Sequence, residues 1–287
     1  MLHLAFHPSL HGTWVARYAI RLAAHQTPPR LAAWQVALPR ATLPGGPGST
    51  VEEEASWGRL EDACRWQQTQ LVEHRVTAPS TASAAIAQAL CTALPCGRDE
   101  FLVCGTRSQP CGGLTLRASV AEHLLADRRR PTLAFHVVHP GLLGTPREVL
   151  IPLAGHPRGL ADLLPWLQLL GDDASRLHLL IVASGRGHWR APRRALTISA
   201  ARDYLTTIER EGLANTPLAR TVADVRVVVA QDAARVILNA ARQLRVGLIL
   251  LGASQRSWLE RLWRGDPIEN ILREAPCDVG IYRGPPP

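Results

Sequence analysis

One irregular sequence pattern occurs twice in this chain of 287 residues, at a constant offset of 147 residues. In each copy an apolar run ends at a glycine, and a second cluster of small and polar residues follows after a short gap. The equivalent positions, each given with its partner in the second half, are Gly105 and Gly252, Ser108 and Gln255, Ala118 and Gly265, Ser119 and Asp266, and Glu122 and Glu269. A repeat of this length predicts two copies of a whole domain rather than a solenoid of short units.

The composition agrees with two compact domains. Hydrophobic residues make up 46% of the chain, which is enough for two cores of the usual size of about 100–150 residues each. We expect the domains at residues 1–140 and 147–287, with the Pro/Gly-rich segment 139–146 as the linker. No apolar stretch approaches the roughly 20 residues that span a bilayer, and the first residues do not resemble a secretory signal. These features predict a cytoplasmic protein without membrane insertion.

The charged residues argue against a nucleic-acid-binding protein, and the cysteines argue against a zinc-binding or disulfide-stabilised one. The 32 basic residues are all arginine and give a formal net charge of +8, but they are scattered over both halves. Without a basic stripe or interleaved aromatic residues, we expect no specific nucleic-acid binding. The six cysteines show no paired C-x-x-C spacing, which favours free thiols over a zinc site or a disulfide framework.

Apolar strands alternate with helices in both halves. The first half predicts strands at Leu2–Phe6, Leu31–Ala37, His74–Thr77, Phe101–Cys104 and Thr132–Val138, and helices at Gly12–Ala24, Val51–Glu73, Thr81–Leu94 and Ser119–Ala126. The second half predicts strands at Val149–Leu153, Leu177–Ala183, Val225–Ala230, Val246–Leu251 and Cys277–Arg283, and helices at Leu160–Leu170, Arg194–Glu211, around Ile237–Leu244 and at Pro267–Glu274. Strands that are apolar throughout require a parallel sheet covered on both faces. The predicted fold class is α/β, with two tandem doubly wound parallel five-stranded sheets.

The repeated pattern lies where such a sheet binds ligands. In open parallel sheets, ligands sit beyond the carboxyl ends of the strands, where loops lead into helix N-termini. Gly252 ends the fourth strand of the second half, and residues 265 and 266 open the next helix. Glycine allows the close approach and positive φ that a phosphate cradle needs, and a hydroxyl can donate to a phosphoryl oxygen. The pattern therefore predicts a site for a nucleotide or another anion.

The spacing G-x-x-G, nine residues, G-[S/T], with Ala275-Pro276-Cys277 at the end of the following run, resembles the universal stress protein family in its tandem form. The resemblance covers essentially the whole chain. It implies an adenine nucleotide alpha hydrolase-like (Rossmann-like) fold and ATP or AMP as the ligand, although some members of the family bind neither. The cofactor-binding residues that it implies are Gly105, Ser108, Ala118 and Ser119 in the first half and Gly252, Gln255, Gly265 and Asp266 in the second.

Both copies depart from the ATP-binding pattern of that family. Ser108 and Gln255 replace its second glycine, Ala118 replaces its third, and Asp266 replaces the hydroxyl residue. The aspartate that holds the nucleoside is His7 in one copy and Ala154 in the other. A carboxylate at a helix N-terminus repels a phosphate, while Asp266 and Glu269, like Ser119 and Glu122, also form a capping box. Arginines in the motif loops are available to neutralise an anion: Arg107, Arg117, Arg256 and Arg264.

These features favour a regulatory protein of the stress-response type, with an adenine nucleotide bound through the degenerate loop. The alternative is an interaction protein that binds no nucleotide and acts through contacts with an unknown protein partner. A slow ATPase is less favoured because no general base, nucleophile or set of metal ligands is visible, and we expect no catalytic or metal-binding residues. In the family, last strands pair across a two-fold axis. Antiparallel pairing of Thr132–Val138 with Cys277–Arg283 would form such a pseudo-dimer within one chain, and a homodimer is the other arrangement.

Overall fold

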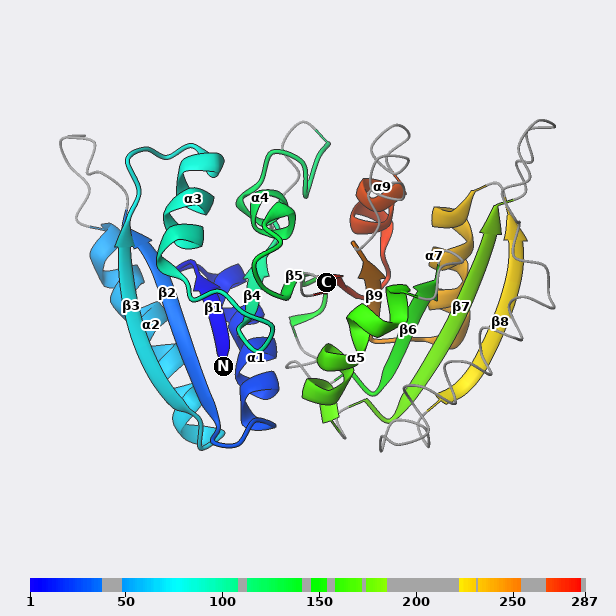
Figure 1. Ribbon diagram of the computed structural model, residues 1–287, viewed down its shortest axis with the longest axis horizontal. Coiled ribbons are helices and arrows are strands. Elements are labelled where there is room, and N and C mark those ends of the chain that lie inside the picture. The colour runs from blue at the N-terminus through cyan, green and yellow to red at the C-terminus, as the bar shows by residue number, and fades with distance from the viewer. Residues whose placement is uncertain are drawn as a thin grey trace. The chain divides into compact units, whose positions relative to one another are not determined.

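The computed structural model describes residues 1–37, 48–107, 113–140, 146–153, 158–171, 174–184, 222–230, 232–253 and 267–284. Contacts divide the chain into two compact units, Met1–Thr145 and Pro146–Gly284. Each unit has its own parallel sheet (Figure 1).

The first unit is a doubly wound sheet. Its strands are β1 (Leu2–Phe6), β2 (Arg30–Ala37), β3 (Gln70–Thr77), β4 (Phe101–Gly105) and β5 (Thr132–His136), in the order β3-β2-β1-β4-β5. Its helices are α1 (Leu10–Ala24), α2 (Gly48–Trp66), α3 (Ser83–Ala93) and α4 (Val120–Ala126). All four strand pairings are parallel. Helix α1 packs beside α2 and α3 beside α4, so that helices cover both faces of the sheet (Figure 1).

The second unit repeats this topology. Its strands are β6 (Glu148–Leu153), β7 (Arg176–Ser184), β8 (Val222–Ala230), β9 (Leu248–Gly252) and β10 (Asp278–Arg283), and its helices are α5 (Arg158–Leu170), α7 (Ala233–Leu244) and α9 (Pro267–Glu274). The order β8-β7-β6-β9-β10 is that of the first unit, again with parallel pairing. The predicted fold class is therefore confirmed for each half. The helix expected at Arg194–Glu211 lies outside the described residues, and the pairing expected between the last strands of the two halves stays a prediction.

The largest error among the predicted boundaries lies at the end of α2 and the start of β3. The helix expected over Val51–Glu73 ends at Trp66, and residues 70–73 belong to β3. Gln68 has a φ of 53°, and the Thr69 N–H donates to the Cys64 carbonyl at 2.9 Å, which closes the helix in the manner of a Schellman turn. Because this left-handed position carries glutamine instead of the usual glycine, the sequence offered no stop signal there.

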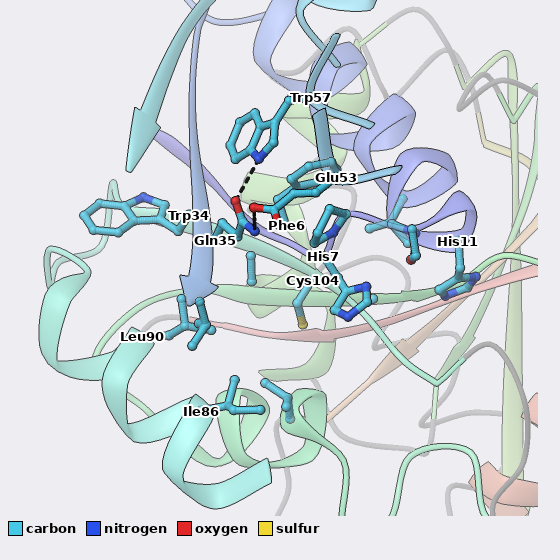
Figure 2. A pocket seen from close by; sticks show the side chains of 18 of the residues that line it. Phe6, His7, His11, Trp34, Gln35, Glu53, Trp57, Ile86, Leu90 and Cys104 are labelled. Carbon is cyan, nitrogen blue, oxygen red and sulfur yellow. Dashed lines mark hydrogen bonds between the residues drawn. The ribbon is translucent and has the colours of Figure 1, made fainter. Parts of the chain in front are cut away.

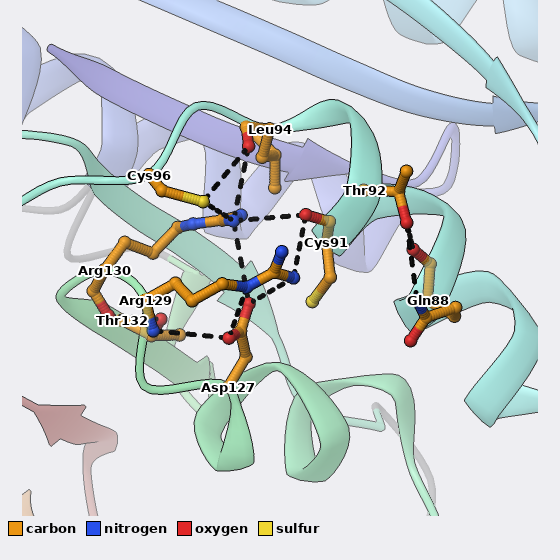
Figure 3. Close-up of polar contacts among 9 residues, drawn as sticks. All are labelled: Gln88, Cys91, Thr92, Leu94, Cys96, Asp127, Arg129, Arg130 and Thr132. Atoms are coloured by element: carbon orange, nitrogen blue, oxygen red, sulfur yellow. Dashed lines mark hydrogen bonds and ion pairs between the residues drawn. The ribbon is translucent and has the colours of Figure 1, made fainter.

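A fully buried arginine lies just before β5 (Figure 3). The Arg130 guanidinium donates through Nη2 to the carbonyls of Cys91 and Leu94 at 3.2 and 3.3 Å, and it lies 3.6 Å from Asp127 Oδ2. Asp127 also accepts from Arg129 Nε at 2.9 Å. Partial burial acts to raise the pKa of Asp127, but the hydrogen bonds from Arg129 outweigh it and the pKa is lowered. Asp127 is thus the carboxylate that balances two adjacent guanidinium groups, one of them fully buried.

Candidate functional site

A pocket with a volume of about 1170 Å3 lies in the first unit (Figure 2). It opens beyond the carboxyl ends of β1, β2 and β4, and its other walls come from α1, α2, α3 and the start of α4. The strand order reverses between β1 and β4, and this switch point is where doubly wound sheets bind their ligands. The volume lies slightly above the range of about 300–1,000 Å3 that is typical of sites for organic molecules.

Of the four predicted site positions of the first half, two line the pocket and a third is next to a lining residue. Gly105 ends β4 and lines the pocket, where a Cβ atom would lie 3.1 Å from Val15 Cγ2 and 3.5 Å from His11 Nε2. Ser119 lines the pocket, and Ala118 directly precedes it. Ser108 lies outside the described residues, as do Gln255, Gly265 and Asp266 of the second half.

His7 takes the place of the aspartate that the family resemblance implied at the end of the first strand. Its side chain is exposed to the space of the pocket and forms part of the pocket wall. The surrounding walls remove part of its hydration, which lowers the pKa of the imidazole below 6.5. The imidazole is therefore mainly neutral at pH 7. It does not supply the negative charge that an aspartate would offer to a sugar hydroxyl.

The loop before α4 is closed by its own side chains. Ala118 has a φ of 53°, in the left-handed region that a motif glycine would occupy, and its N–H donates to Glu122 Oε2 at 2.5 Å. The Ser119 hydroxyl donates to the Leu116 carbonyl and accepts from the Glu122 N–H at 3.2 Å. The capping box predicted from Ser119 and Glu122 is thus confirmed, except that the carboxylate bonds the Ala118 N–H and not that of Ser119. Three groups that a phosphate could use, the Ala118 N–H, the Ser119 hydroxyl and the Glu122 N–H, are thus already bonded within the loop.

Arg107 is also bonded within this loop. Its guanidinium donates to the carbonyl of Arg117 at 3.1 Å and to that of Ala118 at 2.7 Å. Arg107 lines the pocket, but these bonds tie its guanidinium to the loop. Arg256 and Arg264, the equivalent loop arginines of the second half, lie outside the described residues.

In the second unit, Gly252 ends β9 as predicted. A Cβ atom at this position would lie 2.8 Å from the hydroxyl oxygen of Tyr282, a residue of β10 that is 1% exposed. The glycine therefore allows a buried tyrosine to pack against the end of the neighbouring strand. This packing accounts for Gly252 without a ligand.

The residues of the pocket that are arranged most specifically carry no clear signal in the sequence. The Trp57 Nε1–H donates to Gln35 Oε1 at 2.7 Å, and the Gln35 amide donates to Glu53 Oε1 at 2.5 Å (Figure 2). Phe6 meets the Trp57 ring edge-on, with 4.9 Å between the ring centroids. Glu53 and Trp57 come from α2, Gln35 from β2 and Phe6 from β1, so that no single stretch of sequence signals the group.

Two substitutions in the α4 loop should change stability in opposite directions. We expect Ala118→Gly to raise the free energy of unfolding by about 1 kcal/mol, because glycine adopts a φ of 53° without the strain of a Cβ atom. Ser119→Ala should lower it by about 1 kcal/mol, because the N-cap hydrogen bond is lost. Urea denaturation of both variants beside the wild type measures the two effects, and equal shifts would contradict the loop geometry.

Other features that would define a site are absent from the described residues. No group of three or more His, Cys, Asp and Glu side chains is placed to hold a metal ion there. Within the same ranges, no helix combines the length and the apolar character that a membrane crossing requires. The five described cysteines are free, and Cys111 lies outside them.

The fold and the position of the pocket define a doubly wound α/β protein with a pocket at the switch point of its first unit. Residues 147–283 match the model of the universal stress protein family. Solved structures resemble the whole chain: a universal stress protein from Archaeoglobus fulgidus has a TM-score of 0.62 and 16% identity, with 99% of this chain and 96% of that chain covered. A protein of unknown function from Pseudomonas aeruginosa has a TM-score of 0.61 and 16% identity, with coverage of 99% and 92%. Among curated proteins, a search by sequence finds no significant match.

The second half of this chain belongs to the universal stress protein family. The sequence of its second half carries the family match, and the likeness of the whole chain to solved structures shows that the first half has the same fold.

Proposed function

We propose that this chain is a regulatory protein of the universal stress type whose first half binds a small molecule without a phosphate chain. The observation that carries this proposal is the closure of the α4 loop. Glu122 takes the Ala118 N–H, and the Ser119 hydroxyl is bonded to Leu116. A triphosphate would have to displace the Glu122 carboxylate from the Ala118 N–H and the Leu116 carbonyl from the Ser119 hydroxyl.

The charges around the pocket support the same conclusion. Four carboxylates line it, whereas the guanidinium groups that line it are those of Arg75 and Arg107, and Arg107 is bonded to two carbonyl groups. The lining carboxylates are those of Glu53, Glu54, Glu61 and Glu73. ATP carries several negative charges and needs an excess of positive charge or of free N–H donors. The described residues therefore do not fit ATP in the way that the family resemblance implied.

In the second half, the case against ATP rests on the sequence alone. Asp266 is expected to place a negative charge at the N-terminus of the helix that starts at Pro267. We therefore extend the proposal to both halves: neither binds ATP through the degenerate loop. The alternative of an interaction protein that acts only through a protein partner is favoured if the pocket of the first half binds no small molecule at all.

Titration calorimetry with ATP and AMP tests this proposal. We expect no micromolar binding by the wild type and a gain of roughly fivefold in affinity for Asp266→Ser, since removing the charge is worth about 1 kcal/mol while serine still caps the helix. Glu122→Gln is the matched variant of the first half. It removes the charge from the loop but keeps an amide oxygen that can accept from the Ala118 N–H.

Micromolar binding of ATP by the wild type would refute the proposal, and so would unchanged affinity in both variants. Mass spectrometry of small molecules that copurify with the native protein supplies an independent test. Phosphate release measured in the same samples tests the slow ATPase: release above background by the wild type would support that alternative.

A further inference from the structure

We propose that the pocket of the first half recognises an organic amine, whose ammonium group pairs with Glu53 while its apolar body lies among the aromatic walls. This inference rests on the proposed function, because it names the class of ligand that the pocket takes in place of a nucleotide.

The first observation is that Glu53 is held in place by a chain of two hydrogen bonds. Trp57 has only a donor on its ring, so that the Gln35 oxygen must face it and the Gln35 NH2 group must face Glu53. Trp57 and Gln35 are 5% and 6% exposed. Two buried side chains thus fix the orientation of the carboxylate at the pocket wall (Figure 2).

The second observation concerns the charge of this carboxylate. Its hydrogen-bond donor is a neutral amide, and within the described residues Glu53 makes no ion pair. A carboxylate without an ion-pair partner beside a low-dielectric wall attracts a cation more strongly than one in bulk water. An ammonium group supplies the positive charge together with N–H donors for Oε2 of Glu53, the oxygen that accepts no bond from Gln35.

The third observation is the aromatic character of the surrounding wall. Phe6, Trp34 and Trp57 are all buried and all line the pocket. Trp34 is fixed by its own hydrogen bond to His3 Nδ1 at 3.1 Å and by stacking on His74 at 4.0 Å between centroids. Aromatic rings bind both apolar groups and cations, and the cation is favoured most where water is excluded.

The size of the pocket separates an organic amine from a simple cation. A volume of about 1170 Å3 is far larger than an ammonium or metal ion requires, and it extends from α2 to the apolar residues Ile86 and Leu90 of α3. The ligand that complements it has a cationic end at Glu53 and an apolar body.

Three probes of similar shape and different charge test this inference on the full-length protein: tryptamine, the neutral alcohol tryptophol and the anion indole-3-propionate. Binding is measured by NMR titration up to millimolar concentration. We expect tryptamine to bind, tryptophol to bind roughly tenfold more weakly because it lacks the charge-assisted bond, and indole-3-propionate to bind not at all.

Glu53→Gln should abolish the preference for the amine while it retains the hydrogen bond from Gln35 as an amide acceptor. Glu54→Gln is the control: it removes the same charge from an exposed lining residue that accepts no bond from Gln35, and it should keep most of the preference. Trp57→Phe keeps an aromatic ring but removes the donor that orients Gln35, and it should weaken the preference in part. Thermal denaturation of each variant verifies that the fold is retained.

Equal binding of the three probes, the same loss in Glu53→Gln and Glu54→Gln, or no binding of tryptamine would overturn the inference. The proposed function is tested separately by ATP in the same buffer. Micromolar ATP binding would overturn both, whereas weak ATP binding with no preference for the amine would overturn only the ligand class.

Discussion

Asp127→Asn is expected to lower the free energy of unfolding of the first half by about 3–5 kcal/mol, although the new side chain has almost the same shape. The change removes the carboxylate that pairs with Arg130, which is 0% exposed. A buried guanidinium without a counter-charge is among the largest single destabilising effects. Thermal or urea denaturation of the purified variant beside the wild type measures the loss of stability.

An exposed ion pair of the same unit provides the control for this prediction. Asp62 and Arg65 are 2.7 Å apart but 75% and 74% exposed, so that Asp62→Asn should change stability by less than about 0.5 kcal/mol. The double variant Asp127→Asn, Arg130→Met should recover part of the loss, because it removes the unpaired buried charge together with its partner. A double variant that is less stable than Asp127→Asn would contradict this explanation.

Acid should reproduce the effect of the Asp127 substitution. The pKa of Asp127 is lowered in the folded protein, so that its contribution is fully present above the unfolded value of 3.8 and is lost as the pH falls through the folded value. The stability of the wild type should therefore fall faster with acid below that pH than the stability of Asp127→Asn.

Gly12→Ala is expected to destabilise the first half by about 3 kcal/mol, against the usual preference of helices for alanine. A Cβ atom at this position would lie 1.9 Å from the backbone oxygen of His7, and backbone cannot move aside as a flexible side chain can. The clash displaces either the start of α1 or the loop after β1, both of which line the pocket.

The matched control for Gly12 is Gly58, which lies within α2 and has open space around the site of a new Cβ atom. Gly58→Ala should raise stability by about 0.5–1 kcal/mol, because alanine loses less backbone entropy on folding. Opposite signs for the two glycine substitutions, measured by denaturant titration, are the expected result. If Gly58→Ala also destabilises the protein, the loss in Gly12→Ala cannot be assigned to the clash with the His7 backbone.

Most of the fold could be predicted because its signals are local and repeated. Buried strands such as β1 and β9 are continuous apolar runs. Because equivalent positions lie at a constant offset, an element recognised in one half predicts the same element in the other. The end of α2 could not be predicted, since a glutamine with positive φ closes the helix and glutamine carries no such signal.

The candidate site could be predicted only where it follows the ends of secondary-structure elements. Gly105 and Ser119 were placed at the correct edge of the sheet because a strand ends at one and a helix starts after the other. The chain from Trp57 through Gln35 to Glu53 joins a helix to a strand that is distant in sequence. Such a contact depends on how α2 packs against the sheet, and the helical pattern alone does not determine which of its side chains meet β2.

The carboxylate of Glu122 also determines how the first half would respond to any anion. Because it is attached to the same chain as the Ala118 N–H, it acts as a tethered competitor whose effective concentration is of the order of millimolar or higher. A free anion of equal intrinsic affinity must exceed that internal concentration before it gains access to the loop. Under the proposed function, this internal competition keeps the loop closed to phosphate compounds, and the pocket beside it responds to an uncharged or cationic molecule.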